Sequence, residues 1–304
     1  MILLVFKLFL ECYFYIGVFT LIITGTTMKA RTSFTIDADV VAKLDSIVDN
    51  IYYRSKSEAV EDILRKYFEK QNTAIVLCGG EFTIDGTEYY RPLVKIGEST
   101  VIERIISNLR INNFRNIMIS GKTELLKQIF SILKNGEGYG VDIKYIDDNN
   151  LKGSAKALER VKQYVGSTTL FVTGDAIFDI DLRDMLRFHV QHNSPASMAI
   201  YVPADTSFPT KDRVVLKGSK ILSYEKLREP VNSKLIPTSI FLLDQDVFKY
   251  IPPGDLGWSI KTDLLPLLAK DGLLFGYMYN GSWLSIKTRE DLERAKKSME
   301  SRNA

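Results

Sequence analysis

The chain has 304 residues, of which 45% are hydrophobic and 25% are charged, as in an ordinary globular protein. Its net charge of +3 does not by itself indicate a nucleic-acid-binding protein. With only two cysteines and two histidines, neither a disulfide scaffold nor a histidine-based metal site is expected. The length allows one large domain and one small domain.

Residues 1–27 are mostly apolar and are interrupted by Lys7 and Glu11. About 20 apolar residues can span a membrane, but a charged Glu11 inside the span would cost a few kcal/mol. A signal peptide fits poorly, because the positive charge lies within the apolar run. We favour the hypothesis that Met28 is the natural start over a membrane anchor. A cytoplasmic protein without membrane attachment is therefore expected.

Residues 28–72 have the pattern of a small strand-helix-helix module. Polar and apolar side chains alternate over residues 31–36, which predicts a short strand. One helix is expected after Asp37, and a second one at the capping box formed by Ser55 and Glu58. One strand and two helices in about 45 residues cannot bury their apolar faces alone, so a homodimer is expected.

The order of these elements resembles the ribbon-helix-helix family, in which strands from two chains pair and enter the major groove of duplex DNA. The resemblance implies that Arg31, Ser33 and Thr35 contact bases. It also implies that Ser55 and Lys56 hold a phosphate at the start of the second helix. Basic and acidic residues are equal in number here, so electrostatic attraction to DNA would be modest. A dimerisation module without a DNA role stays open as an alternative.

Residues 73–304 have the pattern of a larger α/β domain, joined to the first through residues 71–72. Apolar runs alternate with amphipathic ones, which predicts a three-layer, Rossmann-like fold with a mainly parallel sheet. Strands are expected at residues 74–78, 116–120, 142–146, 169–173, 198–202, 213–216, 221–225 and 235–243. Helices are expected at residues 101–109, 124–133, 154–165, 263–270 and 288–298.

The first strand of this domain ends at Gly79 and Gly80, and a polar loop leads on to Arg91. Glycines at the carboxyl edge of a parallel strand let a phosphate approach backbone N–H groups. The signal is weak alone, because paired glycines after a strand are more often a turn. Three later motifs strengthen it: LKGSAKAL at 151–158, LFVTGD at 170–175 and NGSWLSI at 280–286.

Together these motifs resemble the sugar-phosphate nucleotidyltransferases, also called NDP-sugar pyrophosphorylases, over residues 73–298. The resemblance implies the nucleotide-diphospho-sugar transferase fold and a sugar phosphate, nucleotide or nucleotide sugar as ligand. It implies a Mg²⁺ cofactor, for which Asp175 would be the ligand. The implied catalytic residues are Arg91, Lys95 and Asp175. The implied ligand-binding residues are Leu77, Gly79, Gly80, Gly153, Ser154, Glu225 and Lys226.

The sequence departs from the family pattern at several positions. Ile84 stands for the arginine of the glycine-rich loop, and Ser285 stands for a second metal-binding aspartate. Lys156 and Ser239 replace glycines. The loop also carries three carboxylates that would repel a triphosphate: Glu81, Asp85 and Glu88.

These departures leave three hypotheses for the function. The first is a DNA-binding regulator whose large domain binds a ligand with lost or impaired catalysis. The second is an active sugar-1-phosphate nucleotidyltransferase that uses a nucleoside triphosphate and Mg²⁺, in which Asp179 or Asp181 helps Asp175. The third is a structural dimer with neither activity.

Overall fold

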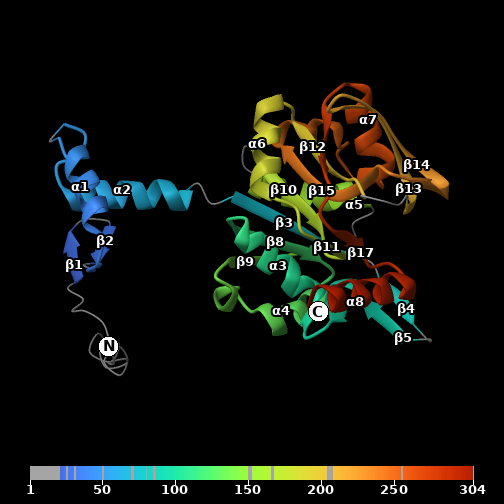
Figure 1. Ribbon diagram of the computed structural model, residues 1–304, viewed down its shortest axis with the longest axis horizontal. Coiled ribbons are helices and arrows are strands. Elements are labelled where there is room, and N and C mark those ends of the chain that lie inside the picture. The colour runs from blue at the N-terminus through green and yellow to red at the C-terminus, as the bar shows by residue number, and fades with distance from the viewer. Residues whose placement is uncertain are drawn as a thin grey trace. The chain divides into compact units, whose positions relative to one another are not determined.

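The computed structural model describes residues 21–24, 27–30, 32–49, 51–69, 72–79, 81–84, 87–149, 153–165, 168–203, 208–254 and 256–303. The chain divides into two compact units, Met1–Lys70 and Gln71–Ala304 (Figure 1). Among the helices that the structure describes, none has the length and hydropathy that a membrane span requires.

The first unit contains a hairpin and two helices. Strand β1 (Leu21–Thr24) pairs with β2 (Thr27–Ala30), and helices α1 (Ala38–Ile47) and α2 (Lys56–Glu69) follow. The Ser55 hydroxyl accepts a hydrogen bond from the Glu58 N–H (3.2 Å), as the capping box predicts. Asp37 occupies the N-cap position of α1, but its side chain makes no capping hydrogen bond.

The strand expected at residues 31–36 is not formed in the single chain. Residues 32–37 belong to no helix or strand, and β2 ends at Ala30. A strand needs a backbone partner, and residues 32–37 pair with no strand in the described part of the chain. A ribbon shared with a second chain stays a prediction. Arg31 lies outside the described residues, whereas Ser33 and Thr35 are exposed.

The described side chains of the first unit form almost no core. Ala59 is the one buried residue among those of this unit whose side chains are described. Large apolar side chains on both helices are exposed, among them Val40, Ile47, Ile63 and Leu64. Apolar helix faces of this kind need a partner surface.

A nine-stranded sheet forms the second unit, in the order β13-β14-β16-β12-β15-β10-β3-β8-β9. Strands β14 and β15 are antiparallel to the other seven strands, so the sheet is mainly parallel, as predicted. All eight predicted strands are confirmed, with bounds that differ by up to eight residues, the most at the end of β14. The strands are β3 (Asn72–Cys78), β8 (Phe114–Gly121), β9 (Asp142–Asp147), β10 (Thr168–Thr173), β12 (Ala196–Tyr201), β13 (Phe208–Lys217), β14 (Lys220–Ser233), β15 (Ile236–Asp244) and β16 (Leu274–Tyr279).

Strand β16 was not predicted, because a glycine interrupts its apolar pattern. The structure gives the reason for Gly276: a Cβ atom there would lie 2.6 Å from Ile200 Cδ1 on the neighbouring strand β12. A side chain at this position would displace the ends of the Ile200 and Leu216 side chains.

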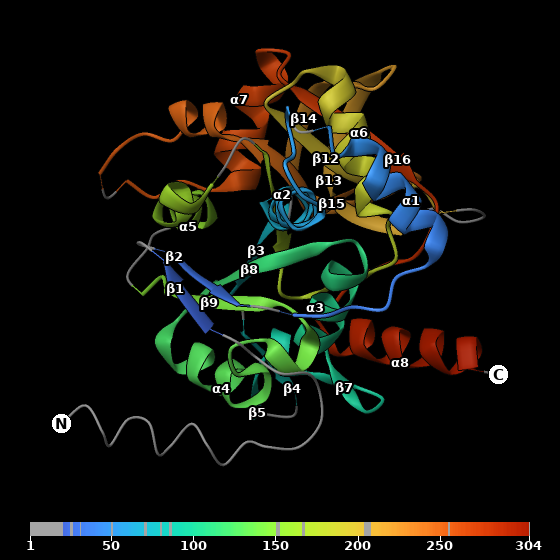
Figure 2. The ribbon, with the colours of Figure 1, turned by 90° about the vertical axis from the view of Figure 1, so that its left-hand side faces the viewer.

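Helices cover both faces of the sheet, which confirms the three-layer prediction. Alternate residues of β3 belong to two cores: Ala74 and Val76 pack on one face, and Ile75 packs on the other. Figure 2 shows α4 and α8 on one side of β3, β8 and β9, and α5 on the other. The helices are α3 (Val101–Ile111), α4 (Thr123–Leu133), α5 (Ser154–Val161), α6 (Leu182–His192), α7 (Leu265–Lys270) and α8 (Arg289–Asn303).

Three short two-stranded ladders complete this unit. They are β4 (Glu81–Ile84) with β5 (Thr87–Tyr90), β6 (Lys95–Ile96) with β7 (Ser99–Thr100), and β11 (Ala176–Phe178) with β17 (Trp283–Ser285). The β4–β5 hairpin replaces the polar loop expected after Gly80. The sequence held a signal for it, because Asp-Gly at 85–86 between β-branched and aromatic residues is typical of a tight hairpin.

Candidate ligand-binding site

A pocket of about 680 Å³ lies at the carboxyl ends of the parallel strands β3, β8, β9 and β10. Each strand delivers a polar group there: Gly79 after β3, Lys122 after β8, Asp148 after β9 and Asp175 after β10. Ligands of open α/β sheets bind at this edge. The volume is within the usual range of about 300–1,000 Å³ for small-molecule sites.

Most of the residues singled out in the sequence lie on the wall of this pocket: Leu77, Gly79, Arg91, Gly153, Ser154, Asp175 and Lys226. Gly80 lies outside the described residues. Lys95 is exposed on β6 and is not part of the wall.

Glu225 also lies outside the pocket, where it forms an exposed ion pair with Arg213 of β13. Successive residues of a strand point to opposite faces, so Glu225 and Lys226 on β14 cannot both face the same ligand. Lys226 is the one that faces the pocket.

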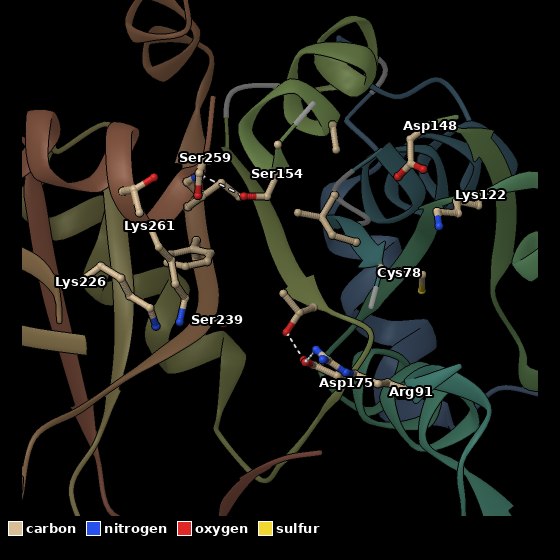
Figure 3. A pocket seen from close by; sticks show the side chains of 18 of the residues that line it. Cys78, Arg91, Lys122, Asp148, Ser154, Asp175, Lys226, Ser239, Ser259 and Lys261 are labelled. Carbon is tan, nitrogen blue, oxygen red and sulfur yellow. Dashed lines mark hydrogen bonds and ion pairs between the residues drawn. The ribbon is translucent and has the colours of Figure 1, made fainter. Parts of the chain in front are cut away.

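Asp175 lies at the base of the pocket with its carboxylate held on both sides (Figure 3). Its Oδ1 accepts a hydrogen bond from the Thr173 hydroxyl (2.7 Å), and its Oδ2 lies 3.4 Å from Arg91 Nη1. The Asp175 carbonyl accepts a hydrogen bond from the Ile286 N–H (2.8 Å). The motif at 280–286 is thereby attached to the motif at 170–175.

The ladder between β11 and β17 places Ser285 opposite Ala176, next to Asp175. A serine therefore stands where the sequence resemblance implies a second carboxylate. Asp179 and Asp181 do not replace it, because both are engaged elsewhere. The Asp179 carboxylate accepts a hydrogen bond from the Ser282 N–H, and Asp181 caps α6.

These residues do not fit a Mg²⁺ ion held by the protein. Mg²⁺ prefers carboxylate, phosphate and water oxygens in octahedral geometry. Here one carboxylate is paired with a guanidinium, and its neighbour is a hydroxyl group. The described part of the chain contains no group of three or more histidine, cysteine, aspartate or glutamate residues that could hold a metal ion.

Two lysines on the opposite wall share one buried carboxylate. Asp212 of β13 lies 3.0 Å from Lys226 Nζ and 2.7 Å from Lys261 Nζ, and it accepts a hydrogen bond from the Tyr224 hydroxyl (2.8 Å). Burial alone would raise the pKa of Asp212, but the charge of Lys261 and these hydrogen bonds outweigh it and lower the pKa below 3.8. Burial lowers the pKa of Lys261, against the charge of Asp212.

Sequence analysis missed both Asp212 and Lys261. Lys261 lies in the π-helical turn Ile260–Leu264 that precedes α7, and such turns are frequent at functional sites. In the sequence it is a lysine before an apolar helix, which is a common surface position. Nothing local indicates that Asp212 lies beneath it.

The start of α5 shapes the pocket through its backbone. Gly153 has a φ of +101°, and a Cβ atom there would lie 2.3 Å from the Trp258 carbonyl oxygen. Gly153, and not Ser154, occupies the N-cap position of α5, so the Ser154 hydroxyl has another role. It accepts a hydrogen bond from the Ile260 N–H (3.0 Å) and so holds the segment that carries Lys261 against α5.

His189 of α6 is buried. Its Nδ1 lies 2.8 Å from Ser197 Oγ, and its Nε2 lies 3.1 Å from Asp244 Oδ1. These residue types occur together in hydrolases, but Ser197 is completely buried and none of the three lines the pocket. This group is a buried hydrogen-bond network that ties α6 to β12 and β15.

The charges on the pocket wall favour an anionic ligand. Four cationic side chains face two carboxylates there: Arg91, Lys122, Lys226 and Lys261 against Asp148 and Asp175. A cleft lined mainly by one sign of charge concentrates ligands of the opposite sign.

The family model described as "Nucleotidyl transferase" matches residues 73–302 of this chain. The chain belongs to the nucleotidyl transferase family. The matched region contains the sheet, apart from Asn72 at the start of β3, and every residue of the pocket wall.

The chain is also similar in sequence to individual curated proteins. The chain is 27% identical to a UTP–glucose-1-phosphate uridylyltransferase of Synechocystis sp., over 70% of this chain and 58% of that protein. It is 26% identical to the bifunctional protein GlmU of Methanococcus aeolicus, over 72% of this chain and 52% of that protein. The chain thus spans somewhat more than half the length of these relatives.

Among solved structures, a Bacillus anthracis protein described as a glucose-1-phosphate thymidylyltransferase, in complex with a sucrose, superposes with a TM-score of 0.65. It is 25% identical in sequence and matches over 74% of this chain and 94% of its own. This similarity agrees with the fold class that the sequence predicted.

Two replaced glycines have different consequences in this member of the family. Ser239 lies on the pocket wall, so its side chain takes up space there. Lys156 is buried outside the pocket, where it pairs with Glu159 (2.9 Å) and donates a hydrogen bond to the Pro252 carbonyl. Only Ser239 alters the shape that a ligand meets.

Proposed function

We propose that the large unit binds a sugar phosphate, a nucleotide or a nucleotide sugar and transfers nucleotidyl groups slowly or not at all. The observation that carries this proposal is the pairing of Asp175 with Arg91 beside Ser285, at the base of a cationic pocket. The pocket keeps the means of holding a phosphorylated ligand. It lacks the second carboxylate that the resemblance implies for catalysis.

The binding role follows from the two lysines. Lys226 and Lys261 together carry one more positive charge than Asp212 neutralises, and both ammonium groups reach the pocket wall. A phosphate group supplies the missing negative charge and can accept hydrogen bonds from both. Asp212 keeps the two lysines close together before the ligand arrives, so the site is preorganised.

The weakness in catalysis follows from the charge that develops during transfer. When a sugar phosphate attacks the α-phosphorus of a nucleoside triphosphate, the leaving pyrophosphate must be neutralised by cations. Arg91 is already engaged with Asp175, and residue 84 is an isoleucine where the family resemblance implies arginine. We therefore expect binding without efficient turnover.

Pyrophosphate release tests this proposal. The full chain is mixed with glucose 1-phosphate, each nucleoside triphosphate in turn, and Mg²⁺. We expect turnover far below about 1 per second, the lower end of ordinary enzymes. A rate in that range would favour the active transferase instead. Binding of glucose 1-phosphate or a nucleotide is followed separately by thermal shift, because a ligand of the folded state raises the melting temperature.

We also propose that the first unit is a homodimeric ribbon-helix-helix module that binds duplex DNA. The exposed apolar faces of α1 and α2 support a partner chain, and the exposed Ser33 and Thr35 support a polar ribbon face. At the start of α2, Lys56 forms a half-exposed ion pair with Asp45 (2.7 Å), which a DNA phosphate could replace.

Gel shifts with duplexes selected from a random library test the DNA role. We expect the full chain to bind and a variant with Arg31→Ala, Ser33→Ala and Thr35→Ala to bind less tightly. Equal binding by this variant would exclude the ribbon face. The absence of any selected duplex would favour the structural dimer without a DNA role.

A further inference from the structure

The two ends of the pocket differ in chemistry. One end carries Lys226 and Lys261, and Figure 3 shows Asp148 and Lys122 together at the other end. The rest of the wall includes small and apolar groups, among them Leu77, Gly79, Gly153 and Ala157. A flat ring fits against such a surface, whereas phosphates belong near the lysines. The end that carries Asp148 is therefore suited to the base of a nucleotide.

The Asp148 side chain is held in a fixed position by the ends of two strands. Its backbone N–H donates to the Gly121 carbonyl (3.0 Å), and its Oδ2 accepts a hydrogen bond from the Ser120 hydroxyl (3.0 Å). The adjacent Asp147 carboxylate accepts hydrogen bonds from the Thr123 hydroxyl and from the Asn149 N–H (2.7 Å). This network fixes the turn after β9, so Asp148 is preorganised toward the pocket.

The carboxylate of Asp148 has room for more donors. Among the described residues, no other residue donates a hydrogen bond to its Oδ1, and each carboxylate oxygen can accept two. Burial raises the pKa of Asp148, with the charge of Asp147 adding to this and the charge of Lys122 opposing it. A ligand that donates two hydrogen bonds would restore the solvation that burial removed.

Only one common base offers two adjacent donors on its pairing edge. Guanine presents N1–H and the N2 amino group side by side, followed by the acceptor O6. Adenine and cytosine would turn a ring nitrogen lone pair toward the carboxylate, and uracil has a single N3–H between two carbonyls. Lys122 lies beside Asp148 and can donate to an acceptor.

We propose that the Asp148 carboxylate accepts hydrogen bonds from N1–H and N2–H of guanine, while Lys122 donates one to O6. The ligand is then a guanine nucleotide or its sugar derivative. This inference rests on the proposed ligand-binding function of the pocket. It assigns Asp148 and Lys122 as the residues that determine base specificity.

Calorimetric titration of the full chain with GDP, ADP, UDP, CDP and inosine diphosphate tests the inference. GDP should bind most tightly. Inosine diphosphate lacks only the N2 amino group and should bind about 5- to 150-fold more weakly than GDP, as expected when a bidentate contact is broken. Glucose 1-phosphate is titrated in parallel to test the lysine end alone.

The Asp148→Asn variant provides a second test. The amide oxygen of asparagine can still accept a hydrogen bond from N1–H, but its NH2 group would face the N2 amino group of guanine, which is also a donor. The variant should therefore lose affinity for GDP. It should prefer xanthosine diphosphate, whose C2 carbonyl can accept a hydrogen bond from this NH2 group. Asp142→Asn is the matched control, because Asp142 begins the same strand β9 and is exposed. It should leave the preference for GDP unchanged.

The outcomes separate the inference from the proposed function. Equal affinity for all diphosphates, or for GDP and inosine diphosphate, would overturn the guanine inference and leave ligand binding intact. Binding of glucose 1-phosphate with no diphosphate bound would overturn the inference and the nucleotide part of the proposal. If Asp148→Asn has a lower melting temperature than Asp142→Asn without ligand, the variant is destabilised. The relative affinities of the natural chain for GDP and inosine diphosphate then decide whether the guanine inference holds.

Discussion

At the scale of single residues, Asp212 links the stability of the large unit to its binding site. Its carboxylate is buried, and it accepts hydrogen bonds from Lys226, Lys261 and Tyr224. Removing one partner of a buried ion pair costs about 3–5 kcal/mol, because the remaining charge stays buried and unpaired. Asp212→Asn should therefore lower both the melting temperature and the affinity for glucose 1-phosphate.

The pH dependence of this effect has a defined sign. The pKa of Asp212 is lower in the folded chain than its ordinary value of 3.8, so its stabilising contribution is complete above that value. It is lost as the pH falls through the lower pKa of the folded state. Melting curves should show a large difference between the natural chain and Asp212→Asn at pH 7, and a smaller one below pH 3.8. Asp246→Asn, in an exposed pair with Lys249, should change little at any pH.

Gly153 is a residue whose backbone conformation the pocket requires. At a φ of +101°, a Cβ atom would overlap the Trp258 backbone. Gly153→Ala should cost about 2–4 kcal/mol in unfolding free energy and weaken ligand binding, because the segment that carries Lys261 must shift. Gly254 is a matched control, since its φ is +87° but nothing lies within 4 Å of its Cβ position. Gly254→Ala should cost only about 1–2 kcal/mol. Equal costs would mean that the contact with Trp258 is unimportant.

At the scale of elements, helices α1 and α2 need a partner surface. Val40 of α1 is 42% exposed and Ile63 of α2 is 46% exposed. Sedimentation of the full chain should show a dimer, and Ile63→Glu should shift it to monomers. Burial of an aliphatic side chain contributes about 1.5–3 kcal/mol, and the substitution acts twice in a symmetric dimer. Lys43→Glu changes an exposed side chain of α1 and serves as the charge control. A natural chain that sediments as a monomer would contradict the dimer.

At the scale of the whole molecule, the proposed functions of the two units can be coupled. Helix α2 ends at Glu69 and strand β3 begins at Asn72, so little chain separates them. If ligand binding changes the affinity for DNA, DNA must change the affinity for the ligand by the same factor, about 5- to 150-fold in typical cases. DNA titrations with and without the tightest ligand of the calorimetric panel, at fixed salt, measure this factor. Identical curves would mean that the large unit is not a sensor for DNA binding.

The sequence alone was enough to predict the α/β class and the order of the main strands. Buried parallel strands are short apolar runs, and their pattern depends on neighbours within a few residues, so β3, β8, β9 and β10 were recognisable one by one. The motifs that carry the family resemblance were recognisable for the same reason. The Asp-Gly signal of the β4–β5 hairpin is equally local.

Tertiary structure alone decided which polar residues meet in the pocket. Alternation along β14 predicts that Glu225 and Lys226 face opposite sides, but only the placement of β14 in the sheet determines which one faces the ligand. Asp148, Asp212 and Lys261 come from three distant elements and look like ordinary surface residues in the sequence. Their chemistry arises because the sheet brings strand ends together and removes water from around them, and no local pattern records which distant side chain will lie opposite.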